Sequence, residues 1–502
     1  MNPQRATLRF KPLGIDTAHD HVVYMSAGCH ICRAEGFAAQ TRVLVASNGR
    51  SLIATLNTVN SDLLGIDEAS LSVSAQHALG VLAGETLHFS HMPVLLSEHH
   101  LRGKIFGERL TDAQLGDIIA DTVAGRLSDL HLAAFVTACA GDRLDLDETI
   151  ALTRAMVNAG ERLQWSRSPV VDKHCVGGLP GNRTTPIVVA IVTAAGLTMP
   201  KTSSRAITSP AGTADTMETL APVDLSPVDI RRVVDETGGC IVWGGGMRLS
   251  PADDILIRIE RPLNLDSDGQ LVASILSKKL AAGSERVLID LPVGPTAKVR
   301  NVHTAERLSR RLRAVGDALG LQVQTVITDG TQPVGRGIGP ALEARDLVQV
   351  LQCDAHAPQD LRDRALLLAG LLLEMGEVAS AGNGKTQASA LLDSGAAWQQ
   401  FLRICAAQGG LRTLPKAPLT EIVCASRAGR VREIDNRILA QIAKLAGAPQ
   451  ACSAGVDLHV KLGDTVLAGQ PLYTLHAEAP GELRYAAHYA AEHEQVIGLD
   501  ND

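Results

Sequence analysis

The sequence predicts an α/β fold with additional α and α+β domains. We expect a helical domain facing a mostly parallel-sheet α/β domain, with a β-rich N-terminal module and a small α+β C-terminal domain. Strand-like and helix-like stretches alternate from Pro169 to about Gly410, which is typical of βαβ units. Only 3 Trp, 4 Tyr and 6 Phe occur among 502 residues, so aliphatic side chains must fill the cores. A chain of this length also favours roughly two to four domains.

Changes in the character of the sequence place the domain limits. The β-rich module covers residues 1–91, and the helical domain covers 92–168 and is completed by 262–285. The central α/β domain, which carries the phosphate-binding segments, covers 169–415, and the C-terminal domain covers 416–502.

The N-terminal module consists of short strands separated by Gly and Asn residues. The predicted strands are Thr7–Phe10, Arg42–Ala46, Ser51–Val59 and Leu71–Val73. In the helical domain the first predicted helix begins at Thr111, where Thr111-Asp-Ala-Gln114 has the form of a capping box. Further helices are predicted at Leu130–Ala140 and Leu146–Ala159.

The central domain begins with a short strand, Val170–Asp172, and a helix that starts at Thr185-Pro186 and runs to Ala195. A second helix begins at Ser226-Pro227 and ends at Gly238. Two continuous apolar runs, Val287–Leu291 and Val323–Thr328, predict strands that are covered on both faces. A helix at Thr304–Leu319 separates these strands, and a helix at Ala341–Leu351 follows them. Such proteins bind ligands at the carboxyl edge of the parallel sheet.

The C-terminal segment predicts a small α+β domain. One helix is expected at Ile434–Leu445. Apolar residues then alternate with glycine turns through Gly455–Asp464 and Val466–Leu472, which indicates short strands.

Charge and cysteine usage limit the environment and the partners. A formal net charge of −7 argues against broad nucleic-acid binding. The N-terminus lacks the apolar core of a signal peptide, and no apolar run approaches the length of a membrane span. The nine cysteines are scattered, and the single CxxC, Cys29 to Cys32, lacks further ligands for zinc. We therefore expect reduced thiols, no metal site and a cytoplasmic protein.

The first chemically informative segment is Val171–Thr185, which reads VDKHCVGGLPGNRTT. A strand ends, glycines expose backbone N–H groups, and a helix begins at its end. Lys173 adds a full positive charge, and the threonines add directional donors. The segment therefore predicts an anion site.

A second segment, Pro200–Thr213, has the same properties. It combines several hydroxyl side chains with Lys201 and Arg205 directly after a predicted strand. Two such loops in one domain are suited to surround a phosphate from both sides. A third segment predicts a helix from Gln270, in which Ser274 and Lys278 lie on one face at i and i+4.

These segments together resemble the thymidine phosphorylase and pyrimidine-nucleoside phosphorylase family. The likeness is greatest to its long branch, with bacterial proteins of the thymidine phosphorylase type and archaeal AMP phosphorylases. It rests on Lys173-His-Cys-Val-Gly-Gly-Leu-Pro-Gly-Asn182, on Lys201–Glu218 over its whole length, and on Ala273-Ser-Ile-Leu-Ser-Lys-Lys279. It covers roughly residues 95–500.

The resemblance implies roles for particular residues. It assigns the attacking phosphate to Lys173, Cys175, Thr185, Ser203 and Thr213. It assigns the nucleoside or nucleotide to Gly178, Ser204, Arg205, Ala206, Ile207, Thr208, Ser209, Thr213, Ser274 and Lys298. Asp266 falls on the proton donor, Lys278 on a base-contacting lysine and His174 on the active-site histidine. Cys175 stands where the family has serine.

The implied reaction is phosphorolysis of the N-glycosidic bond of thymidine or a related pyrimidine nucleoside, giving free base and (deoxy)ribose 1-phosphate. Inorganic phosphate is the co-substrate, no metal or organic cofactor is needed, and a homodimer or higher homo-oligomer is expected. The main alternative is a nucleoside 5′-monophosphate phosphorylase acting on AMP-like substrates, with Ser204–Ser209 and Arg205 receiving the 5′-phosphate. Two further alternatives are a phosphoribosyltransferase of similar fold and a non-catalytic nucleotide-binding protein.

Overall fold

The computed structural model describes residues 7–206, 209–263, 265 and 267–500. Its contacts divide the chain into two compact units: Met1–Arg143 with Asp254–Leu265, and Leu144–Asp253 with Asp266–Asp502. Within the described ranges, no helix has both the length and the apolar character that crossing a membrane requires.

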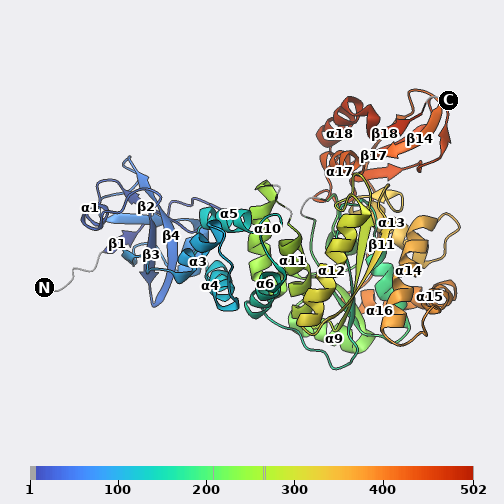
Figure 1. The fold of residues 1–502 in the computed structure, drawn as a ribbon. Coiled ribbons are helices and arrows are strands. Elements are labelled where there is room, and N and C mark those ends of the chain that lie inside the picture. Colours follow the sequence, from blue (N-terminus) through green and yellow to red (C-terminus); the bar gives the residue numbers. More distant parts are fainter. Residues whose placement is uncertain (1–6, 207–208, 264, 266, 501–502) are drawn as a thin grey trace. The chain divides into compact units, whose positions relative to one another are not determined.

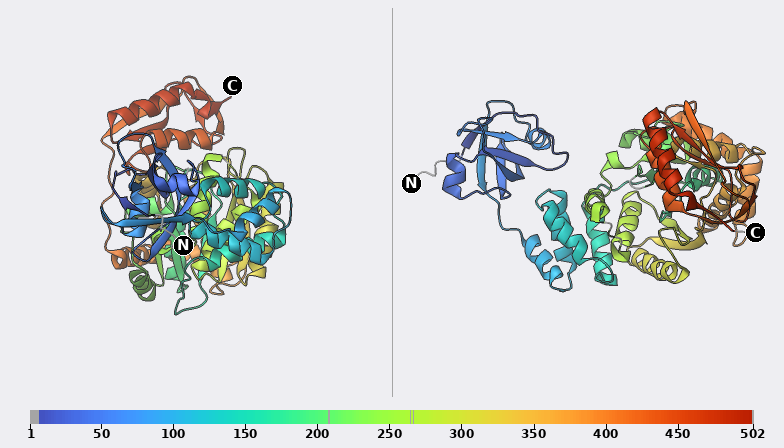
Figure 2. Two further views of the ribbon diagram at one scale, coloured as in Figure 1. Left: turned by 90° about the vertical axis from the view of Figure 1, so that its left-hand side faces the viewer. Right: turned by 90° about the horizontal axis from the view of Figure 1, so that it is seen from above.

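The first unit begins with a closed β-barrel, shown in blue in Figures 1 and 2. Its strand order is β1-β5-β2-β4-β3-β6, with parallel pairing of β1 with β5 and of β2 with β4. The strands are β1 (Thr7–Phe10), β2 (Val22–Ser26), β3 (Arg42–Ser47), β4 (Arg50–Val59), β5 (Glu68–Leu71) and β6 (Thr86–His91). Their alternate residues, such as Leu8, Val43 and Leu56, fill the barrel core.

Two short helices, α1 (His30–Glu35) and α2 (Val73–Leu79), complete the barrel. The predicted strand Leu71–Val73 is wrong at its end, because β5 stops at Leu71 and Ser72 caps α2 through its hydroxyl. Cys29 caps α1 in the same way, with its sulfur accepting from the Cys32 backbone N–H. Both thiols are buried in the barrel core.

The first unit also contains the helices α3 (Leu96–Ile105), α4 (Asp112–Val123), α5 (Asp129–Ala138) and most of α10 (Pro251–Leu263). The predicted capping box is confirmed: the Thr111 hydroxyl accepts from the Gln114 N–H, and the Gln114 side chain accepts from the Thr111 N–H. Arg258 of α10 forms two hydrogen bonds of 2.6 and 2.8 Å to Asp129 at the start of α5.

The second unit contains the predicted, mostly parallel sheet. Strands β11 (Gln322–Asp329), β10 (Arg286–Val293) and β7 (Val171–Cys175) are parallel in that order. Strands β8 (Met199–Ser203) and β9 (Gly239–Trp243) form a parallel pair. A bridge between Val170 and Thr198 joins β7 to β8, so the sheet brings the ends of β7 and β8 to one edge.

Helices cover both faces of this sheet. One apolar core lies between the sheet and α7 (Thr184–Ala194), α14 (Gln359–Met375) and α16 (Ala396–Gln408). A second lies between the sheet and α6 (Leu146–Asn158), α11 (Asp268–Ala281) and α12 (Val302–Ala318). Strand β10 contributes to both cores, because the side chain of Leu288 belongs to the first core and that of Ile289 to the second.

The prediction that β11 is covered on both faces is wrong. Only Val323 and Thr328 of this strand are buried, and Ile327 is 41% exposed. The physical reason is its position, since among the described strands β11 pairs only with β10 and lies at the edge of the sheet. The sheet domain also contains the helices α8 (Thr213–Glu218), α9 (Pro227–Thr237), α13 (Pro340–Leu351) and α15 (Gly384–Asp393). Helix α9 has the predicted limits, with Ser226 capping its start and Gly238 ending it at a φ of 79°.

The C-terminal segment forms a small α+β domain, coloured orange to red in Figure 1. Its elements are β13 (Leu419–Cys424), β14 (Gly429–Ile434), α17 (Asn436–Leu445), β15 (Gly455–Leu458), β16 (Thr465–Val466), β17 (Pro471–Ala477), α18 (Pro480–Glu492) and β18 (Ile497–Leu499). The short strand β12 (Gly337–Ile338), directly before α13, pairs with β15 and joins this domain to the sheet domain.

Candidate active site

The first predicted segment forms a loop at the carboxyl end of β7. Gly177, Gly178, Gly181 and Asn182 all have positive φ angles, so the chain turns sharply between β7 and α7. A Cβ atom on Gly178 would lie 2.3 Å from the Lys298 backbone nitrogen. The structure therefore brings together Gly178 and Lys298, which were predicted to contact the same substrate.

Lys173 is buried beneath this loop, with only 1% of its surface exposed. Its ammonium group donates to the Thr184 hydroxyl at 2.7 Å and to the Thr185 hydroxyl at 3.4 Å, both at the start of α7. Burial lowers the pKa of Lys173, and the nearby Asp290 partly opposes that effect. A buried cation beside two hydroxyls and the amino end of an eleven-residue helix is suited to hold an anion.

Cys175 is the last residue of β7. Burial, followed by the proximity of Asp290, raises the pKa of the Cys175 thiol to about 12, so the thiol stays protonated at neutral pH. The Asn182 amide nitrogen donates to its sulfur at 3.4 Å. Asp290 Oδ2 and Asn182 Oδ1 are buried and have no hydrogen-bond partner among the described residues. Polar atoms left unsatisfied here are consistent with a site that a ligand completes.

The second predicted segment follows β8. Ser203 ends the strand, and its buried hydroxyl has no partner within the described part of the chain. The Asp215 carboxylate accepts from the Ala206 N–H at 2.6 Å and the Gly212 N–H at 2.8 Å, which closes the loop between them. Ile207 and Thr208, two predicted substrate residues, lie outside the described residues. The Ser209 hydroxyl donates to the Ala211 carbonyl at 3.0 Å.

Arg205 is already paired within its own segment. Both terminal nitrogens of its guanidinium contact Glu218, and a third contact joins it to Asp215 at 3.5 Å. The guanidinium also lies over the Trp243 ring, 5.1 Å from its centroid. Its charge is therefore largely neutralised, and its contacts hold the loop rather than present a free cation.

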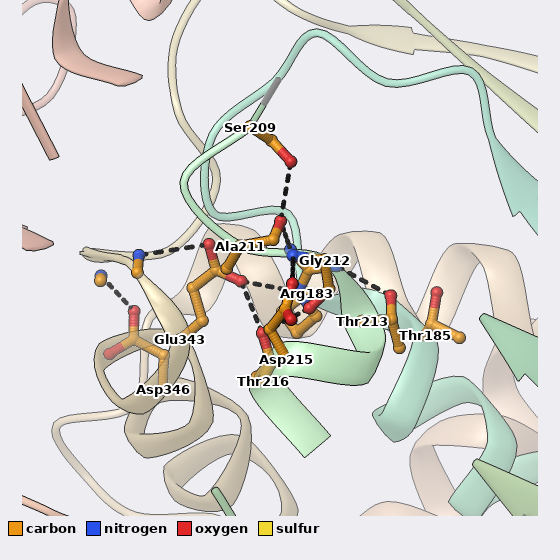
Figure 3. Close-up of polar contacts among 12 residues, drawn as sticks. Arg183, Thr185, Ser209, Ala211, Gly212, Thr213, Asp215, Thr216, Glu343 and Asp346 are labelled. Carbon is orange, nitrogen blue, oxygen red and sulfur yellow. Dashed lines mark hydrogen bonds and ion pairs between the residues drawn. The ribbon is translucent and has the colours of Figure 1, made fainter. Parts of the chain in front are cut away.

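The two segments are joined by Arg183, as Figure 3 shows. Arg183 directly precedes α7, and its guanidinium donates to Thr213 and Ala211 in the second segment and to Glu343 of α13. Neither Arg183 nor Glu343 was expected from the sequence to belong to the site. Arg183 stands inside the first motif, but its partner Glu343 is 160 residues away and has no local signal.

The third segment places Ser274 and Lys278 on one side of α11, as predicted. The Lys278 ammonium donates to the Ser274 hydroxyl at 3.3 Å and to the buried Asp253 carboxylate at 2.5 Å. Asp266, the predicted proton donor, lies outside the described residues.

A buried ion cluster lies close to His174. The Asp172 carboxylate accepts from Lys201 at 3.1 Å and Lys279 at 2.7 Å, and all three side chains are at most 6% exposed. Burial, followed by the positive charges of Lys279 and Lys201, holds the pKa of His174 well below its usual value. His174 is therefore a neutral imidazole at neutral pH. Among the described residues, no three His, Cys, Asp or Glu side chains gather as a metal site.

Family models match three parts of the chain. Residues 98–160 match the helical bundle domain of a glycosyl transferase family, and residues 167–398 match the a/b domain of that family. Residues 430–495 match the pyrimidine nucleoside phosphorylase C-terminal domain. Together with the sheet-edge site, these matches define the class of protein as a glycosyltransferase.

Curated relatives match over the full length. The chain is 61% identical to "Putative thymidine phosphorylase 1" of Acidovorax sp. (strain JS42), covering 100% of this chain and 99% of that protein. It is 57% identical to "Putative thymidine phosphorylase" of Hahella chejuensis (strain KCTC 2396), covering 99% of this chain and 98% of the relative. The chain belongs to the thymidine and pyrimidine-nucleoside phosphorylase family.

A solved structure shares the fold. The crystal structure of anthranilate phosphoribosyltransferase from Thermus thermophilus superposes with a TM-score of 0.52 over 62% of this chain and 99% of that chain. The sequence identity is 21%, so this likeness concerns the fold alone.

Proposed function

We propose that this protein cleaves the N-glycosidic bond of thymidine or a related pyrimidine nucleoside by phosphorolysis. The products are the free base and (deoxy)ribose 1-phosphate. The observation that carries this proposal is the buried Lys173 beneath two α7 hydroxyls, in a chain that matches relatives named for this activity over its full length.

The proposed roles are those that the family resemblance implies. Phosphate lies against Lys173, Cys175, Thr185, Ser203 and Thr213 and attacks C1′ of the sugar. As the C–N bond breaks, negative charge develops on the base; Lys278, which Asp253 holds in place, is the proposed hydrogen-bond donor to it, and Asp266 is the proposed proton donor. Because no protein nucleophile is required, orientation and charge stabilisation carry the rate. Cys175 takes part as a neutral thiol or through its backbone, since its thiol stays protonated.

The nucleotide alternative is less well supported by the geometry. Its main cationic receiver for a 5′-phosphate is Arg205, whose guanidinium is engaged by Glu218 and Asp215. A 5′-phosphate would have to compete with these carboxylates. We therefore place thymidine or a related nucleoside ahead of AMP.

The test is to incubate the purified protein with inorganic phosphate and either thymidine, uridine, AMP or CMP, and to follow release of free base. We expect release from a nucleoside. Lys173→Met should abolish most of it, because the phosphate loses its buried cation, whereas Lys416→Met removes an exposed lysine and should leave activity unchanged. Release from the monophosphates alone would contradict the proposal.

We further propose that the enzyme uses no metal or organic cofactor, acts in the cytoplasm and forms a homodimer or higher homo-oligomer. Base release should be unchanged in excess EDTA. A phosphoribosyltransferase needs a divalent metal to handle pyrophosphate, so inhibition by EDTA would favour that alternative. Light scattering of the purified protein gives the oligomeric state.

A further inference from the structure

We infer that Arg183 is a positioning residue of the phosphate site, which orients the Thr213 hydroxyl toward phosphate and is itself held by Glu343. The inference rests on the proposed function and deepens it.

Among the described residues, each nitrogen of the Arg183 guanidinium has one hydrogen-bond partner. Nε donates to Glu343 Oε2 at 2.6 Å, Nη1 to the Thr213 hydroxyl at 2.8 Å, and Nη2 to the Ala211 carbonyl at 2.9 Å (Figure 3). The side chains of Arg183 and Glu343 are 13% and 2% exposed, so solvent screens this pair little. A planar fork of donors with three fixed partners has one orientation.

The contact with Thr213 determines what its hydroxyl can do next. A hydroxyl has one hydrogen to donate and two lone pairs to accept. Because Arg183 donates to the Thr213 oxygen, the hydroxyl hydrogen points elsewhere and remains available for an anion. Donation from a cation also polarises the O–H bond, which strengthens its own donation.

The same guanidinium holds the loop that carries Thr213. Asp215 closes this loop through the Ala206 and Gly212 N–H groups, and Arg183 adds a bond to the Ala211 carbonyl. Glu343 of α13 accepts from the Thr216 hydroxyl of α8 at 3.0 Å as well as from Arg183. One carboxylate therefore holds both α8 and Arg183. Arg183 therefore fixes the second segment against the first.

Glu343 also explains why Arg183 acts through Thr213 rather than as the principal cation for phosphate. Its carboxylate neutralises the guanidinium at 2.6 Å. Within the described part of the chain, the Lys173 ammonium instead donates to two threonine hydroxyls and to no carboxylate. The positive charge offered to an anion thus comes from Lys173, and Arg183 orients the Thr213 hydroxyl.

The experiment is a double-mutant cycle of Arg183→Met and Thr213→Val, with thymidine and phosphate as substrates. Each single variant should raise the KM for phosphate roughly 10- to 100-fold, the range for one lost charge-assisted hydrogen bond. The KM for thymidine should change less than about twofold, since the lost bond acts on phosphate. If Arg183 acts through Thr213, the double variant should be no worse than the poorer single variant. Fully additive losses would overturn the inference.

A variant that removes both charges separates positioning from folding. Arg183→Met alone leaves Glu343 buried without its cation, whereas Arg183→Met with Glu343→Met leaves no buried charge from this pair. The paired variant should unfold at nearly the wild-type temperature and still show the raised KM for phosphate. Arg183→Lys keeps the positive charge but lacks the planar set of donors, so its KM for phosphate should stay close to that of Arg183→Met. Arg232→Met, which removes an exposed pair with Glu236 and an exposed bond to the Ala407 carbonyl, is the matched control and should behave as wild type.

Phosphate-induced thermal stabilisation gives a readout that does not depend on turnover. Phosphate should raise the Tm of wild type and Arg232→Met, and raise that of the paired variant much less. Equal shifts in all of them, or a wild-type phosphate KM in the paired variant, would overturn the role of Arg183. Phosphate stabilisation without release of any base would instead contradict the proposed function and leave the inference standing. No effect of phosphate on wild type would overturn both.

Discussion

The Asp172 carboxylate holds two buried ammonium groups, from Lys201 and Lys279, directly beside Lys173. Burial by itself raises the pKa of Asp172, but the two lysines bring it below its usual value. With both lysines protonated the cluster carries one excess positive charge, and burial lowers the pKa of Lys279 to about 7. Burial, followed by the positive charges of Lys279 and Lys201, holds the pKa of His174 well below its usual value, so the cluster and the candidate site are electrostatically linked.

Asp172→Asn should be strongly destabilising. It removes the carboxylate in contact with both lysines and leaves two buried cations uncompensated, which costs about 3–5 kcal/mol for a buried pair. Chemical denaturation measures the loss. Glu236→Gln, which removes one partner of an exposed i,i+4 pair, is the control and should change stability by less than about 0.5 kcal/mol. Equal effects would show that the cluster contributes no more than a surface pair.

Lys279 should make stability depend on pH. Its folded pKa is about 7, below its ordinary 10.5. Between these values the unfolded chain holds a proton that the folded chain has released. The free energy of unfolding therefore gains from this group as pH rises from 7 toward 10.5, by at most about 1.4 kcal/mol per pH unit. The gain is lost again as pH falls through 7.

The measurement compares the free energy of unfolding of wild type and Lys279→Met between about pH 7 and pH 9. Titrations of groups that do not interact with Lys279 occur in both proteins and cancel in the difference. We expect wild type to gain relative to the variant as pH rises. A pH-independent difference would place the folded pKa of Lys279 near its ordinary value.

At the level of elements, the candidate site depends on a glycine loop that the flanking strand and helix hold in place. Strand β7 continues through Lys173 to Cys175, three residues beyond the predicted Asp172, because β10 pairs with it up to Asp290. Helix α7 begins at Thr184 and presents the hydroxyls that contact Lys173. Between them, Gly178 approaches the Lys298 backbone. The loop is therefore built around a contact with a segment that follows β10.

Gly178→Ala should impair activity beyond its cost in backbone strain. The residue has a φ of +81°, which costs an alanine about 1–2 kcal/mol, and the added Cβ would displace the segment that carries Lys298. Gly196 is the matched control, since its φ is +91° and a Cβ there meets nothing within 4 Å. Both variants should lose similar stability from strain, but only Gly178→Ala should raise the KM for nucleoside. An equal KM for nucleoside in the two variants would show that Gly178 does not belong to the nucleoside site.

At the scale of the second unit, the C-terminal domain is anchored to the element that supports Arg183. Strand β12 pairs with β15, and α13 begins immediately after it. Arg345 of α13 forms two hydrogen bonds of 2.8 Å to Asp457 of β15. Lys461 donates to the Pro333 and Gly335 carbonyls and to Asp360. The docking of this domain thus fixes the start of the helix that carries Glu343.

Arg345→Met should loosen the C-terminal domain. The half-buried guanidinium pairs with Asp457 and Asp346, and its loss should cost about 1–3 kcal/mol. Limited proteolysis should then cleave faster within residues 411–418, which connect the domains. Arg232→Met is the control, since its pair lies on the exposed face of α9. Unchanged proteolysis would show that strand pairing alone holds the domain.

Local sequence signals predicted much of the fold. The strands Thr7–Phe10 and Val287–Leu291 lie within observed strands, and the caps at Thr111 and Ser226 begin observed helices. These signals succeed because side-chain periodicity and capping act over a few neighbouring residues. The limits at Leu71–Val73 failed because the hydroxyl of Ser72 caps a helix there, which an apolar pattern does not reveal.

The sequence by itself determined the parallel α/β core, the family, and the two segments proposed to bind phosphate, because contiguous residues carry those signals. Only the tertiary structure decided how these parts are joined. Arg183 meets Glu343 across 160 residues, and Asp172 meets Lys279 across 107. Such partners are chosen by sheet order and helix packing, which bring distant segments to one edge. The buried charges that set the orientation of Thr213 and the neutrality of His174 therefore appear only once the chain is folded.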